Sequence, residues 1–402
     1  MPILLTTGPF LPDLIVVIFS LYFCYLFFKK KIFLNTFLIR ILFFFLCLCF
    51  IFFLSSIASN FIFSSLKYSF TYIRFILFSI CIYFLLNKEN SNFYKFFKYF
   101  FYLYSFVIID ALIQFIFTKD LFFIPKPSND RVTGLFGAEL ILGSYLSRLF
   151  PFYLISMIIL KDKVIYHKYI YILLIALNIF VVGVSGERTS LFYIFLILTF
   201  GMLSKIYLKQ ILIFAFFISI ISVFLTNYLN IFVNQRFQQS FNQIIETLDG
   251  KYLISNFHQA HFESAVKMFL DNPILGVGPR NFRFECSDIK YFSEYSCSTH
   301  PHNTYLQLLS ETGIFPTFTV LLIFVFCCFK IFKFIVNKKL NLKLQVEFLL
   351  YISLFISLFP FSPSGSFFNN WLNVIYYLPI PFLIYLNKNT KNFNKFFLIN
   401  KN

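Results

Sequence analysis

The chain has 402 residues, of which 59% are hydrophobic and only 13% are charged. A soluble globular domain carries about a quarter charged residues, so this composition excludes an ordinary soluble protein and a disordered chain. The formal net charge of +17 is of the kind found in nucleic-acid-binding proteins, but the basic residues occur in short runs between apolar segments, as topology signals do. The composition predicts a polytopic membrane protein without a nucleic-acid partner.

Long apolar segments recur along the whole chain. A hydrocarbon core of about 30 Å requires about 20 apolar residues per helix. The segments that meet or approach this length are 10–28, 36–57, 69–86, 96–117, 139–160, 168–184, 189–206, 210–228, 313–334, 346–361 and 370–386. We therefore expect an all-α polytopic integral membrane protein with about 11 transmembrane helices. The first residues lack a basic region and a small-residue cleavage site, so no cleavable signal peptide is expected.

Lysines are concentrated in every second connection between these segments. The lysine-rich connections are 29–31, 88–98, 161–168, 205–209, 330–343 and 387–402. Because basic residues mark the cytoplasmic side, we expect the N-terminus outside and the C-terminus inside. The predicted parts are an eight-helix transmembrane region (1–228), a large outer loop (229–312), a three-helix transmembrane region (313–386) and a basic cytoplasmic tail (387–402).

The outer loop is too long to serve only as a connection. It holds four of the five histidines, His258, His261, His300 and His302. Its basic and acidic residues nearly balance, so the positive excess of the chain lies on the cytoplasmic side. Polar chemistry is therefore expected in this loop.

Two of the eight cysteines, Cys286 and Cys297, lie in the outer loop, and the others lie in or beside apolar segments. If the loop faces an oxidising compartment, these two should form a disulfide. The alternative is a zinc site that combines them with His300 or His302, although the spacing matches no common structural zinc pattern.

The C-terminal half of the loop predicts two short helices joined by a tight turn. Asp271-Asn272-Pro273 ends a helix at about 257–270. Gly276-Val277-Gly278-Pro279 permits a sharp backbone path. A second helix is expected over 304–312, and Gly313 breaks or bends it where the chain re-enters the membrane.

Four stretches resemble, in the same order, segments of the O-antigen ligase and polymerase superfamily, membrane glycosyltransferases that handle lipid-linked glycans. HNTYLQLLSETGIF (302–315) resembles the ligase signature, in which His is followed by Asn, Ser or Gln, nine residues and Gly-x-x-Gly. The others are DNPILGVGPRNF (271–282), which resembles an Asn-Pro segment with Gly-x-Gly, SGERTSLF (185–192), a Ser-Gly-x-Arg turn, and RVTGLFGAELILGSYL (131–146), the entry to the middle helices. The four together are more specific than any one of them.

The chain departs from the family pattern at three points. Pro316 replaces the last Gly of the signature. The helix before Asn-Pro often carries an Arg about four residues before a Trp, whereas this chain has His258 and Phe262 near those places. His258 therefore replaces the second family Arg, or Arg280 or Arg283 supplies it. Family members also often have twelve spans, one more than expected here.

The resemblance implies a GT-C-like fold in a bacterial inner membrane and a periplasmic site for the outer loop. The donor would be a glycan on undecaprenyl diphosphate, and the acceptor would be lipid A core for a ligase or the growing glycan for a polymerase. The family uses an arginine clamp in place of a divalent metal. We therefore expect an inverting, metal-independent glycosyltransferase without a cofactor, with membrane lipid as its surroundings.

The resemblance also assigns roles to residues. His302 is the candidate general base, because a histidine with a near-neutral pKa can take the proton of the acceptor hydroxyl. Arg188, Arg280 and Arg283, in that order, are candidates for the diphosphate clamp, because arginine makes charged bidentate contacts with phosphate. Supporting positions are Arg131, His258, His300, Asn303 and Glu311.

Structural interpretations stand beside these roles. His300 is expected to orient the loop through Pro301. Asn303 is either a helix cap or a substrate contact, and Glu311 either pairs with an arginine or lies on a solvated face. At membrane depth, Asp110 is expected to pair with Arg74 or Arg148, and such groups either hold helices together or line the path of a lipid head group.

Three other functions remain open. Transfer to a protein acceptor is a variant of the same chemistry. A flippase or exporter of lipid-linked glycan would also be polytopic with intramembrane arginines, but it would not need a histidine-bearing outer loop. A non-catalytic scaffold of an envelope complex would need the fold of the loop but neither His302 nor Arg188.

Overall fold

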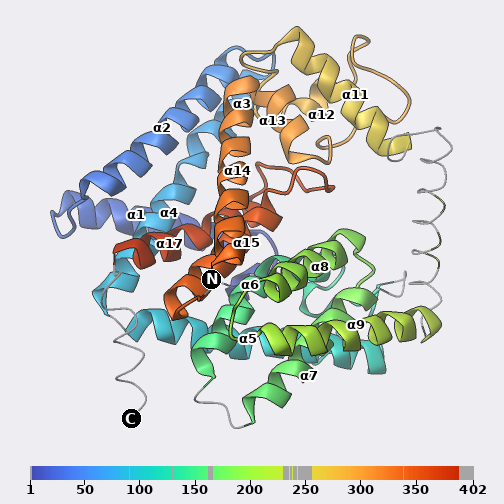
Figure 1. The fold of residues 1–402 in the computed structure, drawn as a ribbon. Coiled ribbons are helices and arrows are strands. Elements are labelled where there is room, and N and C mark those ends of the chain that lie inside the picture. Colours follow the sequence, from blue (N-terminus) through green and yellow to red (C-terminus); the bar gives the residue numbers. More distant parts are fainter. Residues whose placement is uncertain are drawn as a thin grey trace.

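The computed structural model describes residues 2–89, 91–127, 131–161, 166–229, 256–337 and 339–388, together with the single positions 235, 238 and 242. Within these residues the secondary structure is helical and contains no strand (Figure 1). The predicted all-α class is confirmed. The basic tail lies outside the described residues from residue 389 onward.

The helices follow the apolar segments closely. Those before the outer loop are α1 (Phe10–Phe28), α2 (Thr36–Ile57), α3 (Ile62–Tyr72), α4 (Arg74–Lys88), α5 (Ser91–Phe117), α6 (Leu142–Leu160), α7 (His167–Val184), α8 (Arg188–Leu203) and α9 (Lys209–Leu229). Those that follow are α11 (Asn256–Asp271), α12 (Phe282–Glu285), α13 (Thr304–Thr312), α14 (Ile314–Val336), α15 (Leu342–Ser357), α16 (Asn370–Tyr377) and α17 (Pro379–Lys388). The helices predicted at 257–270 and 304–312 are α11 and α13.

Among the described residues, seven helices are long and apolar enough to cross a membrane, with α3 and α4 counted together as Ile62–Lys88. This supports a polytopic membrane protein. Helix also occupies the remaining predicted segments, but α8 is shorter, and the segment 370–386 is divided between α16 and α17. The number of eleven spans stays a prediction.

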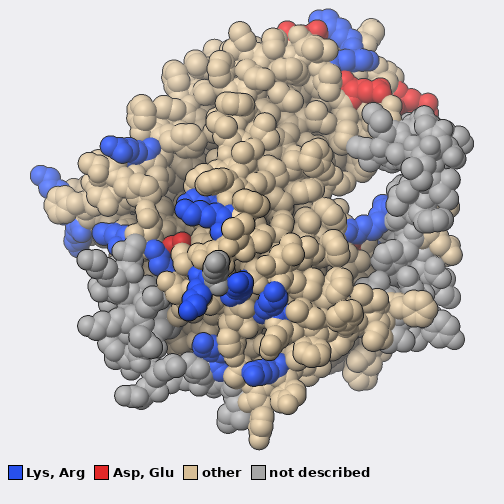
Figure 2. Space-filling model, in the orientation of Figure 1, with Lys and Arg blue, Asp and Glu red and all other residues tan. Residues whose placement is uncertain are grey.

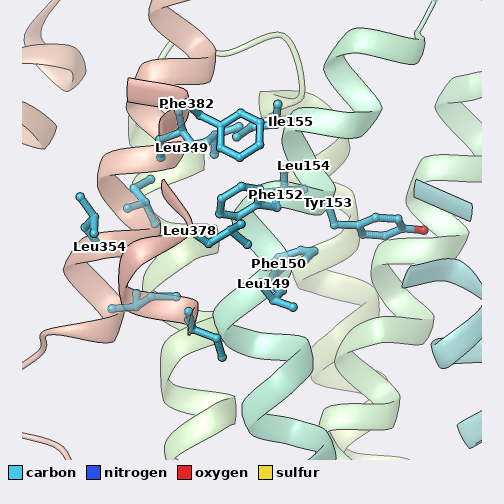
Figure 3. Packing of buried hydrophobic residues seen from close by; sticks show 14 of the residues in the cluster. Leu149, Phe150, Phe152, Tyr153, Leu154, Ile155, Leu349, Leu354, Leu378 and Phe382 are labelled. Atoms are coloured by element: carbon cyan, nitrogen blue, oxygen red, sulfur yellow. The ribbon is translucent and has the colours of Figure 1, made fainter. Parts of the chain in front are cut away.

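Helix α6 lies at the centre of the helical assembly. All of its residues except Ser144 are buried, and it packs against α5, α7, α8 and α15. The ring centroid of Phe152 lies 6.1 Å from that of Phe97 and 5.7 Å from that of Phe382. Figure 3 shows Phe152 and Phe382 within this packing. A helix that is apolar on all sides is suited to such an interior place, and it buries the one cation that α6 carries, Arg148.

The connections fall into two groups by their contacts. On one side, the connection after α2 reaches α12, where Asn60 Nδ2 donates to Glu285 Oε1 at 3.0 Å. On the other side, the backbone N–H of Tyr207 donates to Gln345 Oε1 at 2.8 Å, and Lys161 Nζ lies 4.6 Å from the Tyr207 ring centroid. These are the two sets obtained by taking the predicted connections alternately.

Charge follows the same division on the visible face. Basic side chains gather mainly over its lower half, whereas the acidic ones lie mostly at the upper right, over α11 (Figures 1 and 2). The distribution agrees with the alternation of lysine-rich connections. Which group faces the cytoplasm stays a prediction.

The pairing predicted for Asp110 is wrong. Arg74 Nη2 lies 2.8 Å from Asp13 Oδ1 and donates to Asn370 Oδ1 at 2.8 Å. Asp110 Oδ1 instead accepts from the backbone N–H of Leu121 at 3.1 Å. Asp13 lies in the first turn of α1, a helix that packs against α4, and sequence spacing does not show which helices are neighbours.

Candidate functional site

The N-terminus of α13 carries His302 immediately before its cap. Asn303 is the N-cap, and its Oδ1 accepts from the backbone N–H of Tyr305 at 2.9 Å and of Leu306 at 3.1 Å. Its Nδ2 donates to Pro360 O at 2.7 Å. The amide is therefore engaged on both sides as a helix cap, and it ties α13 to the connection between α15 and α16.

The backbone of His302 is held in an unusual conformation. Its φ is 56°, in the left-handed region that residues other than glycine seldom occupy. The N–H of Ser364 donates to His302 O at 2.9 Å, and His300 Nε2 contacts Ser364 O at 3.2 Å. The connection between α15 and α16 thus holds the His300–His302 loop in place.

The four outer-loop histidines meet in one cluster. The ring centroid of His302 lies 4.2 Å from that of His300, 5.3 Å from that of His261 and 5.6 Å from that of His258. His258 and His261 are three residues apart on α11, which places them on one face of that helix. His302 Nε2 also lies 3.1 Å from Ser298 Oγ.

The cluster keeps its imidazoles neutral. Burial, followed by the neighbouring His300, His261 and His258, lowers the pKa of His302 to about 4. Burial also lowers the pKa of His300 to about 4, with Arg283 adding to the effect. The expected near-neutral pKa of His302 is therefore wrong, because the sequence does not show that four imidazoles share one buried place.

The three clamp candidates flank this cluster. Arg188 is the first residue of α8, and its charge adds to burial in lowering the pKa of His258. Arg280 and Arg283 act in the same way on His300. Positive charge therefore lies near the neutral imidazoles, an arrangement that is suited to an anion.

Arg280 is positioned by two distinct contacts. Its guanidinium Cζ lies 4.2 Å from the Tyr68 ring centroid, a cation–π distance. Its backbone φ is 62°, and its N–H donates to Glu311 Oε2 at 2.9 Å. Arg283 is held separately, by donation from Nη2 to Thr299 O at 3.3 Å.

Glu311 is fully buried and organises the loop that carries Arg280. Besides the Arg280 N–H, it accepts from the Phe282 N–H at 3.2 Å and from Gln307 Nε2 at 2.9 Å. Burial raises the pKa of its carboxyl to about 7. The predicted location of Glu311 on a solvated face is therefore wrong. Its carboxylate accepts from the backbone N–H of Arg280 and forms no ion pair with the Arg280 guanidinium.

Glycine is required where this loop crosses α13. A Cβ on Gly276, whose φ is 64°, would lie 2.4 Å from the carbonyl carbon of Glu311. A Cβ on Gly313, whose φ is 79°, would lie 2.1 Å from Ile274 O. The close approach lets the Gly278 N–H donate to Glu311 O at 2.9 Å.

Arg131 belongs to a separate network of contacts around the turn that precedes α8. Its Nε donates to Ser185 O at 2.6 Å, and its Nη2 lies 4.0 Å from Glu187 Oε1. Glu187 also accepts from the backbone N–H groups of Gly143 at 2.7 Å and Ser144 at 2.8 Å. This network fixes the turn from which Arg188 enters α8.

Cys286 and Cys297 form a disulfide, with their Cα atoms 5.1 Å apart. The bond joins the end of α12, which carries Arg283, to the residue before Ser298. In the described part of the chain, no three His, Cys, Asp or Glu side chains are arranged to hold a metal ion.

Reduction of this disulfide should loosen the site without unfolding the membrane helices. We expect the double change Cys286→Ser and Cys297→Ser to destabilise the outer loop by about 2–3 kcal/mol. Protease sensitivity of the loop measures this, with Cys47→Ser in α2 as a control, because Cys47 is a free cysteine. Equal protection of both variants would contradict the expected role.

Sequence reasoning missed the contributions of His261, Ser364 and Tyr68. The spacing of His258 and His261 is a helical signal for the first of these. No pattern near Ser364 or Tyr68 points to the site, because both come from distant parts of the chain and reach it only through tertiary packing.

Comparison with known families bears on the same region. Residues 172–325 match the family described as O-antigen ligase, a stretch that runs from α7 into α14 and contains the histidine cluster and the three clamp candidates. No curated protein and no solved structure matches the chain. The match over residues 172–325 supports the resemblance to the O-antigen ligase and polymerase superfamily.

Proposed function

We propose that the protein is a membrane glycosyltransferase that moves a glycan from undecaprenyl diphosphate to a hydroxyl acceptor. The observation that carries the proposal is the histidine cluster around His302 inside the O-antigen ligase match, with Arg188 acting on His258 and with Arg280 and Arg283 acting on His300. A lipid-linked glycan and a polysaccharide acceptor agree with this family. The His302-Asn303 pair favours a ligase, with lipid A core as acceptor, over a polymerase.

The proposed reaction uses the imidazole and the arginines at opposite ends of the bond that breaks. The acceptor oxygen forms a bond to the anomeric carbon and loses its proton to His302. The bond from that carbon to the diphosphate oxygen breaks, and the electron pair leaves with the diphosphate. Arg188, Arg280 and Arg283 would stabilise the charge that develops there, as electrostatic catalysis requires. Direct displacement inverts the anomeric centre.

The proposed orientation places the histidine cluster on the periplasmic face of the inner membrane. The N-terminal 3₁₀ segment Pro2–Thr6 contacts α16, where Trp371 Nε1 donates to Leu5 O at 2.9 Å. It therefore lies on the side of the connection that holds His302. Regions 1–228 and 313–386 would then form the membrane body, and 229–312 would cover its outer face.

Reconstitution of the full-length protein tests the function. Vesicles containing the protein receive a labelled glycan on undecaprenyl diphosphate together with lipid A core. We expect glycosylated acceptor and free undecaprenyl diphosphate, in amounts unchanged by a chelator, because arginines supply the positive charge. Movement of intact donor across the bilayer without consumption would overturn the proposal in favour of a flippase.

The pH dependence of kcat/KM should reflect the lowered pKa of the cluster. A base with a pKa of about 4 is already unprotonated at neutral pH, so the rate should stay level from pH 7 to about pH 5 and fall below about pH 4. A fall centred near 6.5, the ordinary histidine value, would contradict the buried cluster.

The stability of the outer loop should also decrease as the pH falls. The folded pKa of His302 lies below the unfolded value, so the neutral form contributes stability that is complete above about pH 6.5 and is lost as the pH falls towards 4. Protease protection of the loop, measured over the same pH range, checks this.

A further inference from the structure

Arg148 is a buried cation without an acidic partner among the described residues. It lies in the interior helix α6, and only 3% of its surface is exposed. Its Nε donates to Ser144 Oγ at 3.2 Å, and its Cζ lies 5.0 Å from the Tyr193 ring centroid. Its Nη1 is buried without a hydrogen-bond partner.

Arg74 provides the contrast. This arginine also lies within an apolar span, at the first position of α4, but its Nη2 lies 2.8 Å from Asp13 Oδ1 and donates to Asn370 Oδ1 at 2.8 Å. Its charge is thus balanced by the protein. In the described part of the chain no carboxylate lies within 4.0 Å of Arg148.

An unbalanced buried charge is costly, and arginine cannot escape the cost by losing its proton. A hydroxyl and an aromatic ring offset only part of it. An ionisable residue at membrane depth therefore indicates a ligand of opposite charge. The free Nη1 and the fork geometry of the guanidinium are suited to phosphate oxygens.

The position of Arg148 specifies the kind of phosphate. Ser144, one turn before Arg148 in α6, donates its N–H to Glu187 Oε2 at 2.8 Å, and Glu187 precedes Arg188. One helical turn rises about 5.4 Å. Tyr193, which the guanidinium faces, lies five residues into α8 from Arg188, about 7.5 Å along that helix. Arg148 thus lies deeper among the helices than Arg188.

We propose that the Arg148 guanidinium binds the phosphate nearer the lipid in a polyprenyl-diphosphate donor. Arg188 and the outer-loop arginines then hold the phosphate nearer the sugar. The identity of the donor rests on the proposed function, but the binding of a lipid phosphate at Arg148 is testable without any transfer reaction.

The test measures binding of undecaprenyl phosphate and of inorganic pyrophosphate to the full-length protein in nanodiscs. Arg148→Gln should weaken binding of undecaprenyl phosphate by about tenfold or more, as loss of a charged hydrogen bond does. The matched control Arg74→Gln should lower the Tm of the unliganded protein and leave this affinity within about threefold. The apo Tm of Arg148→Gln should equal or exceed that of the wild type, since an unbalanced buried charge is removed.

Several outcomes would overturn the proposal. Wild-type affinity of Arg148→Gln for undecaprenyl phosphate, together with a loss of Tm like that of Arg74→Gln, would show that the guanidinium has a structural role. If pyrophosphate bound as tightly as undecaprenyl phosphate, with the same dependence on Arg148, the ligand of the site would be free phosphate and not a lipid phosphate. Arg148→Met covers the case in which the Gln variant does not accumulate: a lower Tm at unchanged affinity would also overturn the proposal.

Failure here is separable from failure of the proposed transfer reaction. If wild-type protein transfers no glycan but still binds lipid phosphate through Arg148, the proposed transferase function is wrong and the proposed phosphate-binding site is supported.

Discussion

Replacing His302 with alanine should lower the rate of glycan transfer by about 10²–10⁴-fold, the usual contribution of a general base. The protein should stay at wild-type abundance in the membrane, because the loop is also held by His300, Asn303 and the disulfide. Surface glycan on a gel ladder measures the effect in cells. Long glycan chains accumulating on undecaprenyl diphosphate would indicate a ligase, and single repeat units a polymerase.

Two further variants make this test specific. His302→Asn suits the left-handed backbone, which asparagine tolerates well, and it should be as inactive as the alanine variant because it cannot accept the proton. His167→Ala is the matched control, since His167 lies outside the cluster and its ring contacts Tyr207. If both His302 variants gave a normal ladder, His302 would not be the general base, and the transport or scaffold functions would be favoured.

The second large effect is expected at Glu311. Glu311→Ala leaves the buried N–H groups of Arg280 and Phe282 without an acceptor, and the Gln307 amide loses one of its two acceptors and keeps Ser366 Oγ at 3.0 Å. Each unsatisfied donor costs about 1–3 kcal/mol, so the variant should lose about 3–5 kcal/mol of stability. Thermal unfolding and membrane abundance measure this loss.

Glu311→Gln separates the role of Glu311 in positioning Arg280 from its role in the stability of the fold. The amide keeps an acceptor oxygen but places an NH₂ group where a second acceptor was, so Arg280 should move while the fold persists. We expect a raised KM for the donor with a smaller change in kcat. Glu263→Ala on α11 is the matched control, because this side chain is exposed and its Oε1 accepts from Gln259 Nε2 at 2.9 Å. Equal effects at both positions would contradict a positioning role for Glu311.

Much of the framework was predictable from the sequence. Apolar segments became helices at nearly the expected bounds, because a run of apolar residues in a membrane must satisfy its backbone within itself. Asn303 and Gly313 marked the two ends of α13 through local capping and turn chemistry, which act over a few residues. The His-Asn signature likewise pointed to His302 without any knowledge of its surroundings.

The tertiary structure decided what surrounds these residues. His258 and His302 are far apart in the sequence, and only the packing of α11 against α13 brings their rings to 5.6 Å and lowers both pKa values. The same holds for the arginines: Arg74 lies beside Asp13 on α1, whereas no carboxylate of the residues that the structure describes lies within 4.0 Å of Arg148. Burial and long-range charge depend on which helices are neighbours. Local sequence determines that a helix forms, whereas the environment of each charge is set by packing across the whole chain.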